Sequence, residues 1–388
     1  MRTVITADRL WNGGQTIEQP IVVIEDGLIA SVGTRSDTEF PLDAKVLHYP
    51  GATLAPAYLD VHIHGSDGHD VMEATPEALA GVAKFIASHG TGSFLATTVT
   101  APVDTTLRSL SGIAKEIAKA RDNGHAGSEA RILGIHFEGP FISPHRRGVH
   151  PADLILPPDT ELFDRMYDAA EGHARLMTIA PEMPGAIELA KHAISRGVHI
   201  SLGHSNATVA EARAGFDAGA VSATHTFNAM RPFDHREPGI IGAVLANDSL
   251  FAELICDGVH TARESVVMWW RSKGPERAIL VTDAMSAAGK PDGMYRLGAM
   301  TVEVKDGKAS AGDALAGSLL TLDRGVSNLI AFTGAPLGDA LRAATVNPAK
   351  MIGAGDRTLK PGRAADIVAI DAAGKLVASV IGGEVAER

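Results

Sequence analysis

The sequence of 388 residues predicts an α/β fold, a (β/α)8 TIM-like barrel beside a small β-sandwich built from both chain termini. Short apolar, β-branched runs alternate eight times with longer stretches in which apolar residues recur at helical spacing. Histidines and acidic residues close several of these runs. Strands of alternating polarity occupy both ends of the chain. We therefore expect the barrel at residues 54–355 and the small domain at residues 1–53 together with 356–388.

The two chain ends carry the same kind of pattern. Residues 2–53 contain short alternating strands with a turn at 25–27, and residues 356–388 repeat this around a turn at 371–375. Neither segment is long enough to bury a core alone, because a small sheet needs several strands and a packed face. Each end can supply what the other lacks, so we expect one sandwich assembled from both.

The central part of the chain contains the strands and helices of the expected barrel. The strand-like runs are 59–64, 92–99, 132–139, 175–182, 199–204, 220–227, 251–258 and 279–284. Helical spacing is clearest at 75–89, 107–120 and 186–195. Eight alternating units favour a closed parallel barrel over an open sheet. After the last strand, residues 286–318 are rich in Gly, Ala and Asp around a strand-like 300–304, which predicts a hairpin excursion over the barrel mouth.

Composition excludes several classes of partner. Hydrophobic residues make up 45% and charged residues 21% of the chain, an ordinary globular balance. The formal net charge of −11 argues against nucleic acid and anionic membranes as partners, because both need a basic face. The sequence shows neither a signal peptide's apolar core nor a membrane-length segment. Cys256 is the only cysteine, so no intramolecular disulfide can form. We expect a cytoplasmic protein.

Candidate metal ligands stand at the ends of the predicted strands. His62 and His64 lie two residues apart on one strand and so project from the same face. Two neutral imidazoles side by side can hold a divalent metal. The carboxyl ends of the strands in a parallel barrel meet at one face, where functional residues gather. The remaining ligand-type residues that close strand-like runs are Glu138, His204, His225 and Asp283.

These residue types suit a hydrolytic metal site. Such a site needs a few protein ligands, an open position for water and a separate group that moves protons. Glu138, His204 and His225 form a set of one carboxylate and two imidazoles, and Asp283 is the obvious proton shuttle. A single histidine at a strand end is more often a hydrogen-bonded core residue than a ligand, but five ligand-type residues at one end of a barrel reverse those odds. Hydrolysis of an amide or a related bond follows from these parts.

His136 provides a contrast on the same strand as Glu138. It shares a strand face with that carboxylate but lies deeper in the predicted barrel. For His136, packing or a supporting hydrogen bond to a ligand is therefore at least as well founded as metal binding.

Several longer motifs resemble those of a known family. They lie at 203–208, 224–230, 236–239, 257–260, 280–284 and 361–368. Together they resemble the amidohydrolase superfamily and, within it, the N-acetylglucosamine-6-phosphate deacetylases, over nearly the whole chain. The resemblance implies a metal-dependent hydrolase that converts N-acetyl-D-glucosamine 6-phosphate to D-glucosamine 6-phosphate and acetate.

The resemblance also implies residue roles. Glu138, His204 and His225 would bind the main metal, with His62 and His64 completing it or forming a second position. Asp283 would act as general base and then as acid, and His260 would polarise the acetyl carbonyl. Asn228, Ala229 and Arg236 would receive the sugar phosphate, and in this family the arginine can reach a neighbouring subunit's site. This implies a homodimer, with a homotetramer as the alternative. The remaining expected substrate contacts are Val149, His150, Asp257, Leu315, Ala316 and Gly317.

Some alternatives stay open at this point. Family members with Gln-x-Asn in place of His62-Ile63-His64 bind one metal, whereas His-x-His members can hold two, so the expected number is one or two. Zn²⁺ or Fe²⁺ is favoured, with Mn²⁺ or Co²⁺ as alternatives. The substrate could instead be N-acetylgalactosamine 6-phosphate or another N-acyl compound, and a non-catalytic sugar-phosphate sensor is the least favoured reading. The fourth strand ends at 178–182 without the lysine that many binuclear relatives carboxylate, which argues against dihydroorotase-like or hydantoinase-like chemistry.

Overall fold

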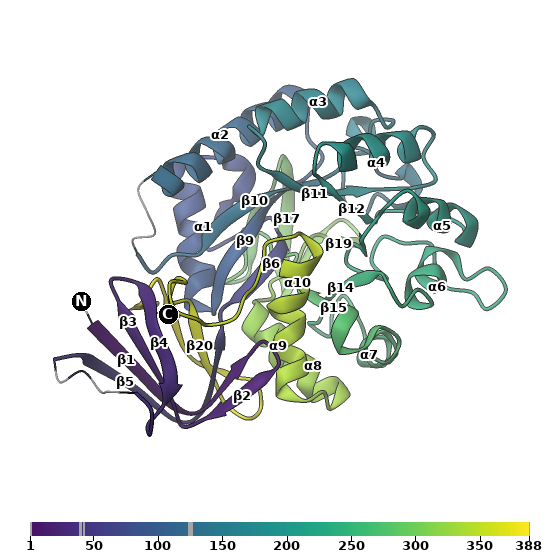
Figure 1. Ribbon diagram of the computed structural model, residues 1–388. Coiled ribbons are helices and arrows are strands. Elements are labelled where there is room, and N and C mark those ends of the chain that lie inside the picture. Colours follow the sequence, from purple (N-terminus) through teal and green to yellow (C-terminus); the bar gives the residue numbers. More distant parts are fainter. Residues whose placement is uncertain (1, 39–40, 42, 123–126, 388) are drawn as a thin grey trace.

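The computed structural model describes residues 2–38, 41, 43–122 and 127–387 (Figure 1). A barrel of parallel strands occupies the middle of the chain, and helices cover its outer side (Figure 1). A sheet formed by both chain ends, antiparallel except for one parallel pair of strands, lies beside it (Figure 1). The predicted fold class is therefore confirmed.

The barrel sheet follows sequence order along its path, from β6 through to β15. It closes where the Asp283 amide donates to the His62 carbonyl at 2.8 Å and the His64 amide donates to the Ala284 carbonyl at 2.8 Å. The strands begin within a few residues of the expected positions because their runs are buried on both faces and nearly continuously apolar. They are β6 (Tyr58–Ile63), β9 (Thr91–Thr98), β10 (Arg131–Glu138), β11 (Ala174–Ile179), β12 (His199–Leu202), β13 (Ser222–Ala223), β14 (Phe251–Ile255) and β15 (Ala278–Val281).

Some of the helices begin at side-chain caps. The Thr75 hydroxyl accepts from the Ala78 amide at 3.2 Å at the start of α1, and Thr208 with Glu211 forms a capping box on α5. None of the helices in the described ranges is long and apolar enough to cross a membrane. The α-helices are α1 (Pro76–Ser88), α2 (Val103–Asp122), α3 (Thr160–Ala169), α4 (Ala186–Ser195), α5 (Val209–Asp217), α6 (Gly239–Leu245), α7 (Arg263–Arg277), α8 (Leu322–Thr333), α9 (Leu337–Ala344) and α10 (Val346–Met351). Short 3-10 turns are η1 (Val71–Glu73), η2 (Pro144–Arg146) and η3 (Ala152–Leu154).

The terminal sheet joins the two ends of the chain. Its order is β22-β21-β20-β5-β1-β3-β4, with β2 paired to β1, and the C-terminal β20 lies antiparallel to β5. The boundary expected between residues 53 and 54 falls within β5, and the division into two domains stays a prediction. The strands are β1 (Arg2–Asn12), β2 (Gln15–Glu18), β3 (Pro20–Glu25), β4 (Leu28–Thr34), β5 (Lys45–Pro56), β20 (Ile367–Ile370), β21 (Leu376–Ile381) and β22 (Glu384–Val385).

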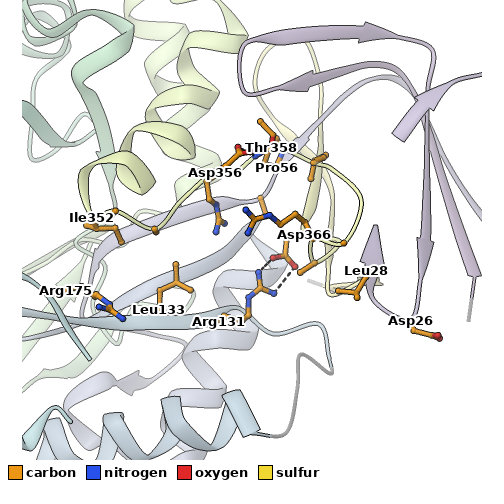
Figure 2. Close-up of a pocket in the computed structure, with 18 residues that line it drawn as sticks. Asp26, Leu28, Pro56, Arg131, Leu133, Arg175, Ile352, Asp356, Thr358 and Asp366 are labelled. Carbon is orange, nitrogen blue, oxygen red and sulfur yellow. Dashed lines mark hydrogen bonds and ion pairs between the residues drawn. The ribbon is translucent and has the colours of Figure 1, made fainter. Parts of the chain in front are cut away.

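An ion pair connects the barrel to the terminal sheet. Arg131, the first residue of β10, pairs with the buried Asp366 carboxylate, which also accepts from the Gly382 amide at 2.9 Å (Figure 2). Arg131 and Asp366 border a cavity of about 810 Å³ at the amino ends of the barrel strands (Figure 2). None of the candidate ligands lines this cavity.

The excursion expected at 286–318 forms a small antiparallel sheet. Its strands are β16 (Gly293–Leu297), β17 (Met300–Lys305), β18 (Lys308–Ala311) and β19 (Ala314–Leu315). Val302 and Val304 of β17 are buried, and they belong to an apolar cluster that also contains Val99 and Met285 of the barrel loops. The Asp70 carboxylate accepts from the Gly298 amide at 2.6 Å, next to the hairpin of β7 (Gly65–Ser66) and β8 (His69–Asp70). The small sheet is thus fastened to the carboxyl end of the barrel.

Candidate active site

The predicted ligands lie at the carboxyl end of the barrel. Glu138 is the last residue of β10, and His204, His225 and Asp283 each follow the end of a barrel strand by two residues. These three residues have positive φ angles of 46°, 27° and 50°. Non-glycine residues adopt such conformations at a cost of about 1–3 kcal/mol, at functional sites and also in ordinary turns such as those at Asp26 and Asp306. The three strand ends therefore share one backbone feature, and the contacts of their side chains decide whether they form a site.

One group of side chains surrounds the Glu138 carboxylate. His204 Nε2 and His225 Nε2 each lie 3.1 Å from Glu138 Oε1, and they lie 3.1 Å from one another. His62 Nε2 is 3.3 Å from the same oxygen, and His64 Nε2 is 3.2 Å from Oε2. All of these side chains are buried. The expected set of one carboxylate and two imidazoles is therefore brought together, with His62 and His64 next to it.

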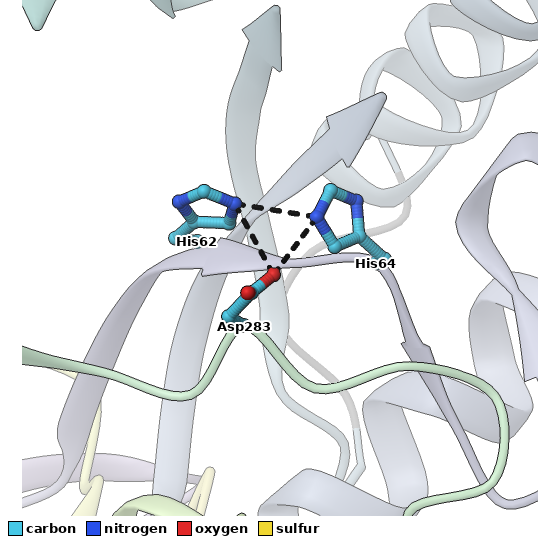
Figure 3. Close-up of side chains that lie close together, drawn as sticks. All are labelled: His62, His64 and Asp283. Atoms are coloured by element: carbon cyan, nitrogen blue, oxygen red, sulfur yellow. Dashed lines mark hydrogen bonds and ion pairs between the residues drawn. The ribbon is translucent and has the colours of Figure 1, made fainter. Parts of the chain in front are cut away.

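A second group shares these two histidines (Figure 3). His62 Nε2 lies 3.2 Å from His64 Nε2 and 3.5 Å from Asp283 Oδ1, and His64 Nε2 lies 3.1 Å from the same oxygen (Figure 3). Ligand bonds of about 2.0–2.1 Å around a tetrahedral Zn²⁺ place neighbouring ligand atoms about 3.3 Å apart. Both groups have spacings near this value, so the residues fit a divalent metal.

Two imidazoles are held in the tautomer that a metal needs. His64 Nδ1 lies 2.9 Å from the Thr97 carbonyl, and His204 Nδ1 lies 3.1 Å from the Arg146 carbonyl. A carbonyl only accepts, so each Nδ1 carries a proton and Nε2 is the ring atom left for a metal, which would take the place of any proton there. Burial lowers the pKa of His204 to about 4, which keeps its ring neutral.

The carboxylates dominate the electrostatics of the remaining groups. Burial disfavours a charged His62, but Glu138, Glu253 and Asp283 outweigh it and raise the pKa of His62 well above its usual value. The same competition raises the pKa of His64 to about 9, chiefly through Asp283 and Glu138. Burial opposes ionisation of Glu138 and Asp283, yet the neighbouring imidazoles hold the pKa of both carboxyls below the ordinary range. The cluster is therefore organised to attract positive charge.

The site opens into a cavity of about 290 Å³, near the lower end of ligand pockets. His260 faces this cavity, and its Nδ1 lies 2.7 Å from Asp257 Oδ2. Burial opposes protonation of this imidazole, but the hydrogen bond and charge of Asp257 raise its pKa. The sequence-predicted residues that line the cavity are His64, Glu138, Val149, His150, His204, His225, Asn228, Ala229, His260, Asp283, Leu315 and Gly317.

Other predicted residues lie outside the cavity wall. His62 is fully buried among the ligands, Asp257 lies behind His260, and Ala316 is buried between two cavity residues. Arg236 is exposed and does not line the cavity of its own chain. Its role at a phosphate site stays a prediction.

Two further histidines, His150 and His136, lie at different depths in the barrel relative to the ligand cluster. His150 Nε2 lies 3.6 Å from Glu138 Oε2, and together with His204 these residues form another group that could hold a metal. The sequence predicted His150 as a contact of the sugar. The structure also places its side chain next to the candidate metal ligands. His136 lies below the cluster, with Nε2 at 2.8 Å from Thr178 Oγ1 and Nδ1 at 3.2 Å from the Val61 carbonyl. Burial holds the pKa of His136 well below its usual value. It belongs to no ligand group found among the described residues.

The sequence analysis did not identify Glu253 as a site residue. This carboxyl is fully buried in β14, and its Oε2 lies 3.6 Å from His62 Nδ1. A signal was available in the sequence, because Glu253 is the one charged residue in the apolar run 251–256. A charged side chain in a fully buried strand needs a partner or a function.

Comparison with known proteins agrees with this geometry. The model of the amidohydrolase family matches residues 53–386. The chain is 37% identical to an N-acetylgalactosamine-6-phosphate deacetylase of Escherichia coli O157:H7, over 96% of each chain. It is 36% identical to an N-acetylglucosamine-6-phosphate deacetylase of Bacillus subtilis (strain 168), over 96% of this chain and 94% of that one.

A solved structure is similar over the full length. It is a mutant N-acetyl-D-glucosamine-6-phosphate deacetylase from Mycobacterium smegmatis in complex with N-acetyl-D-glucosamine-6-phosphate, at a TM-score of 0.91 and 35% identity, covering 100% of both chains. The unmutated protein from the same organism has a TM-score of 0.89 at 35% identity, with 99% of each chain covered. The chain is a hydrolase of the amidohydrolase family, and within that family it belongs with the N-acetylglucosamine-6-phosphate deacetylases.

Proposed function

We propose that this protein hydrolyses the acetamide of N-acetyl-D-glucosamine 6-phosphate, giving D-glucosamine 6-phosphate and acetate. The observation that carries the proposal is the convergence of the ligand cluster, Asp283 and His260 on one cavity, in a chain that belongs with these deacetylases. A second substrate is N-acetylgalactosamine 6-phosphate, because the Escherichia coli relative at 37% identity is named for it. A 4-epimer differs in the direction of one hydroxyl, which pocket hydrogen bonds can discriminate.

One or two divalent cations complete the proposed site. Glu138, His204 and His225 would hold the main cation, and the group of His62, His64 and Asp283 would hold a second or complete the first. Imidazole and carboxylate donors favour Zn²⁺ or Fe²⁺, and they also accept Mn²⁺ or Co²⁺. When bound, such a cation supplies Lewis-acid polarisation of the acetyl carbonyl and lowers the pKa of water toward about 7.

The chain's own residues would move the protons and receive the developing charge. Asp283 lines the cavity, so its carboxylate can take a proton from water at the acetyl carbonyl and return it to the departing amine. His260 is held by Asp257 and faces the same cavity, where its ring would stabilise negative charge on the carbonyl oxygen.

The phosphate end involves a neighbouring subunit in this proposal. Asn228 and Ala229 line the cavity and supply local donors, although the whole chain is acidic. Arg236 is exposed outside the cavity of its own chain, which is consistent with a guanidinium that completes the site of a second copy. We therefore propose a homodimer, with a homotetramer as the alternative, located in the cytoplasm.

The test is acetate release by metal-loaded protein. Three substrates are compared: N-acetylglucosamine 6-phosphate, its 4-epimer, and N-acetylglucosamine without the phosphate. We expect turnover largely confined to the first. Faster turnover of the epimer would identify N-acetylgalactosamine 6-phosphate as the substrate and leave the proposed reaction unchanged. Silence on all three, with metal content verified, would reject the proposal and favour another N-acyl substrate or a sugar-phosphate sensor.

A further inference from the structure

Glu253 is a buried carboxylate that the proposed mechanism leaves without a task. Its side chain has no exposed surface, and neither carboxylate oxygen has a hydrogen-bond partner among the described residues. Its nearest complementary atom is His62 Nδ1, at 3.6 Å from Oε2. That nitrogen is also buried and lacks a hydrogen-bond partner in the described part of the chain. The two atoms lie just beyond hydrogen-bond distance. His62 Nδ1 can donate a hydrogen bond and Glu253 Oε2 can accept one, so each could satisfy the other.

His62 differs in this respect from two other imidazoles of the cluster. The Nδ1 atoms of His64 and His204 donate to backbone carbonyls, at 2.9 Å and 3.1 Å. His62 faces a carboxylate in the same position. A carboxylate acceptor fixes the proton on Nδ1, orients the ring and makes Nε2 a stronger electron donor than a carbonyl acceptor does.

His62 is also shared by two of the three ligand groups. It belongs to the group with Glu138 and His225 and to the group with His64 and Asp283. Two carboxylates, Glu138 and Asp283, already balance the charge of one divalent cation. Glu253 places a third carboxyl group beside this set, and the complementary contact that the described residues give it is His62 Nδ1 at 3.6 Å. A buried acidic group needs such a partner, and a second cation bound through His62 would strengthen the contact.

We infer that Glu253 is a positioning residue that holds His62 for metal ligation and so enables a second divalent cation to bind at the group of His62, His64 and Asp283. The inference rests on the proposed function only in taking the cluster to bind metal. The inference explains why two cations would bind rather than one: the ligand residues alone permit either number, and Glu253 favours the second cation.

The experiment is a Co²⁺ titration of full-length protein that has been stripped with a chelator. Bound equivalents are measured by equilibrium dialysis, and the d–d absorption reports the coordination of each equivalent. The variants are Glu253→Gln, which keeps the shape but loses the charge, and Glu253→Met, which also loses the acceptor. Leu254→Met is the matched control, because Leu254 is equally buried on the next position of the same strand. Thermal unfolding of each apo-protein verifies that it is folded.

We expect two equivalents for the wild-type protein and for Leu254→Met. In Glu253→Gln the second equivalent should bind about 10–100-fold more weakly while the first is nearly unchanged, and Glu253→Met should lose more. The inference is overturned if the wild-type protein binds one equivalent, if the variants keep both affinities, or if both equivalents weaken together. Failure of the proposed function would be seen separately, as missing acetate release by protein that binds both equivalents.

Discussion

At the scale of single residues, Asp283 is the group that tests the proposed proton transfer. Its carboxylate lies against His64 and lines the cavity, and the imidazoles hold its pKa below the ordinary range. Asp283→Asn keeps the side-chain shape and one oxygen that can ligate a metal. The amide cannot take the proton from water or return it to the amine. We expect kcat to fall by about 10²–10⁴-fold, the usual range for loss of a general acid or base. Steady-state acetate release measures the effect.

The control for this variant is binding. Elemental analysis should still find the main cation of Glu138, His204 and His225, and calorimetry should give a substrate affinity within a few-fold of the wild-type value. Near-normal turnover in Asp283→Asn would remove this residue from the mechanism. Loss of metal together with turnover would instead assign Asp283 mainly to the ligands.

The pair of His260 and Asp257 predicts a pH effect. The Asp257 carboxylate, 2.7 Å from His260 Nδ1, raises the pKa of that imidazole against the opposing effect of burial. The imidazolium form therefore persists to higher pH, and a rate that depends on it falls as pH rises through the raised pKa. Asp257→Asn removes the raising charge and leaves the burial, so the alkaline limb should move to lower pH.

A pH profile of kcat/KM at saturating metal measures this shift, which we expect toward lower pH in Asp257→Asn. His260→Asn serves as the comparison, because it removes the titrating ring and should remove that limb. An alkaline limb that stays in place in Asp257→Asn would contradict the role given to the imidazolium.

At the scale of elements, the barrel strands could be predicted because burial on both faces requires continuous apolar runs. The run 132–139 became β10, and its terminal Glu138 reached the site as expected. The run 220–227 behaved differently. Its strand pairing is limited to β13, since the chain bends at His225 with a φ of 27° to place the ring over the barrel. The spacing and the apolar character of residues predict where a strand starts, but they do not predict such bends in the backbone.

Other features depended on contacts between distant parts of the chain. Glu253 contacts His62, which lies about half the chain away in sequence but only two strands away in the closed barrel, across β15. Arg131 meets Asp366 in the same way. Such side-chain pairs form because the barrel closes and the two chain ends join in one sheet. Local sequence patterns therefore cannot predict them.

The small sheet of β16–β19 predicts an effect on substrate binding. Val302 and Val304 fasten β17 to the barrel loops, while Leu297 of β16 and Leu315 of β19 line the cavity. Replacing both valines with alanine should cost about 2 kcal/mol at each position and loosen this sheet. We expect KM to rise several-fold with metal content unchanged, and faster hydrogen exchange at 293–315.

Thr301→Ala with Glu303→Ala is the matched control, because both side chains are exposed on the other face of the same strand. This pair should leave KM and exchange at wild-type values. An unchanged KM in the valine variant, with exchange clearly faster, would separate the small sheet from the substrate site.

At the scale of the whole molecule, stability and chemistry are placed at opposite ends of the barrel. The pair of Arg131 and Asp366 joins barrel and terminal sheet at the amino ends of the strands. Arg131→Ala leaves the nearly buried Asp366 carboxylate with the Gly382 amide as a remaining donor. We expect a loss of about 2–3 kcal/mol in the free energy of unfolding, below the range for fully buried pairs because Arg131 is partly exposed.

Urea unfolding measures this loss, with kcat and metal content expected to match the wild-type values. Arg175→Ala is the control, since Arg175 lines the same cavity but is exposed, and it should change stability by less than about 0.5 kcal/mol. A fall in kcat in folded Arg131→Ala protein would show that the two ends of the barrel are coupled.

The proposed exchange of Arg236 between subunits can be tested by complementation. Arg236→Ala should raise KM for the phosphorylated sugar by about 10–100-fold, because hydrogen bonds to a charged group contribute about 1.5–3 kcal/mol. Asp283→Asn abolishes turnover in its own chain. If Arg236 acts across the interface, a mixed dimer holds one site with Asp283 from one chain and Arg236 from the other. Random mixing makes about half of the dimers mixed, so activity of about a quarter of the wild-type value should return at low substrate concentration. No recovery after verified subunit exchange would place Arg236 in its own chain's site or outside catalysis.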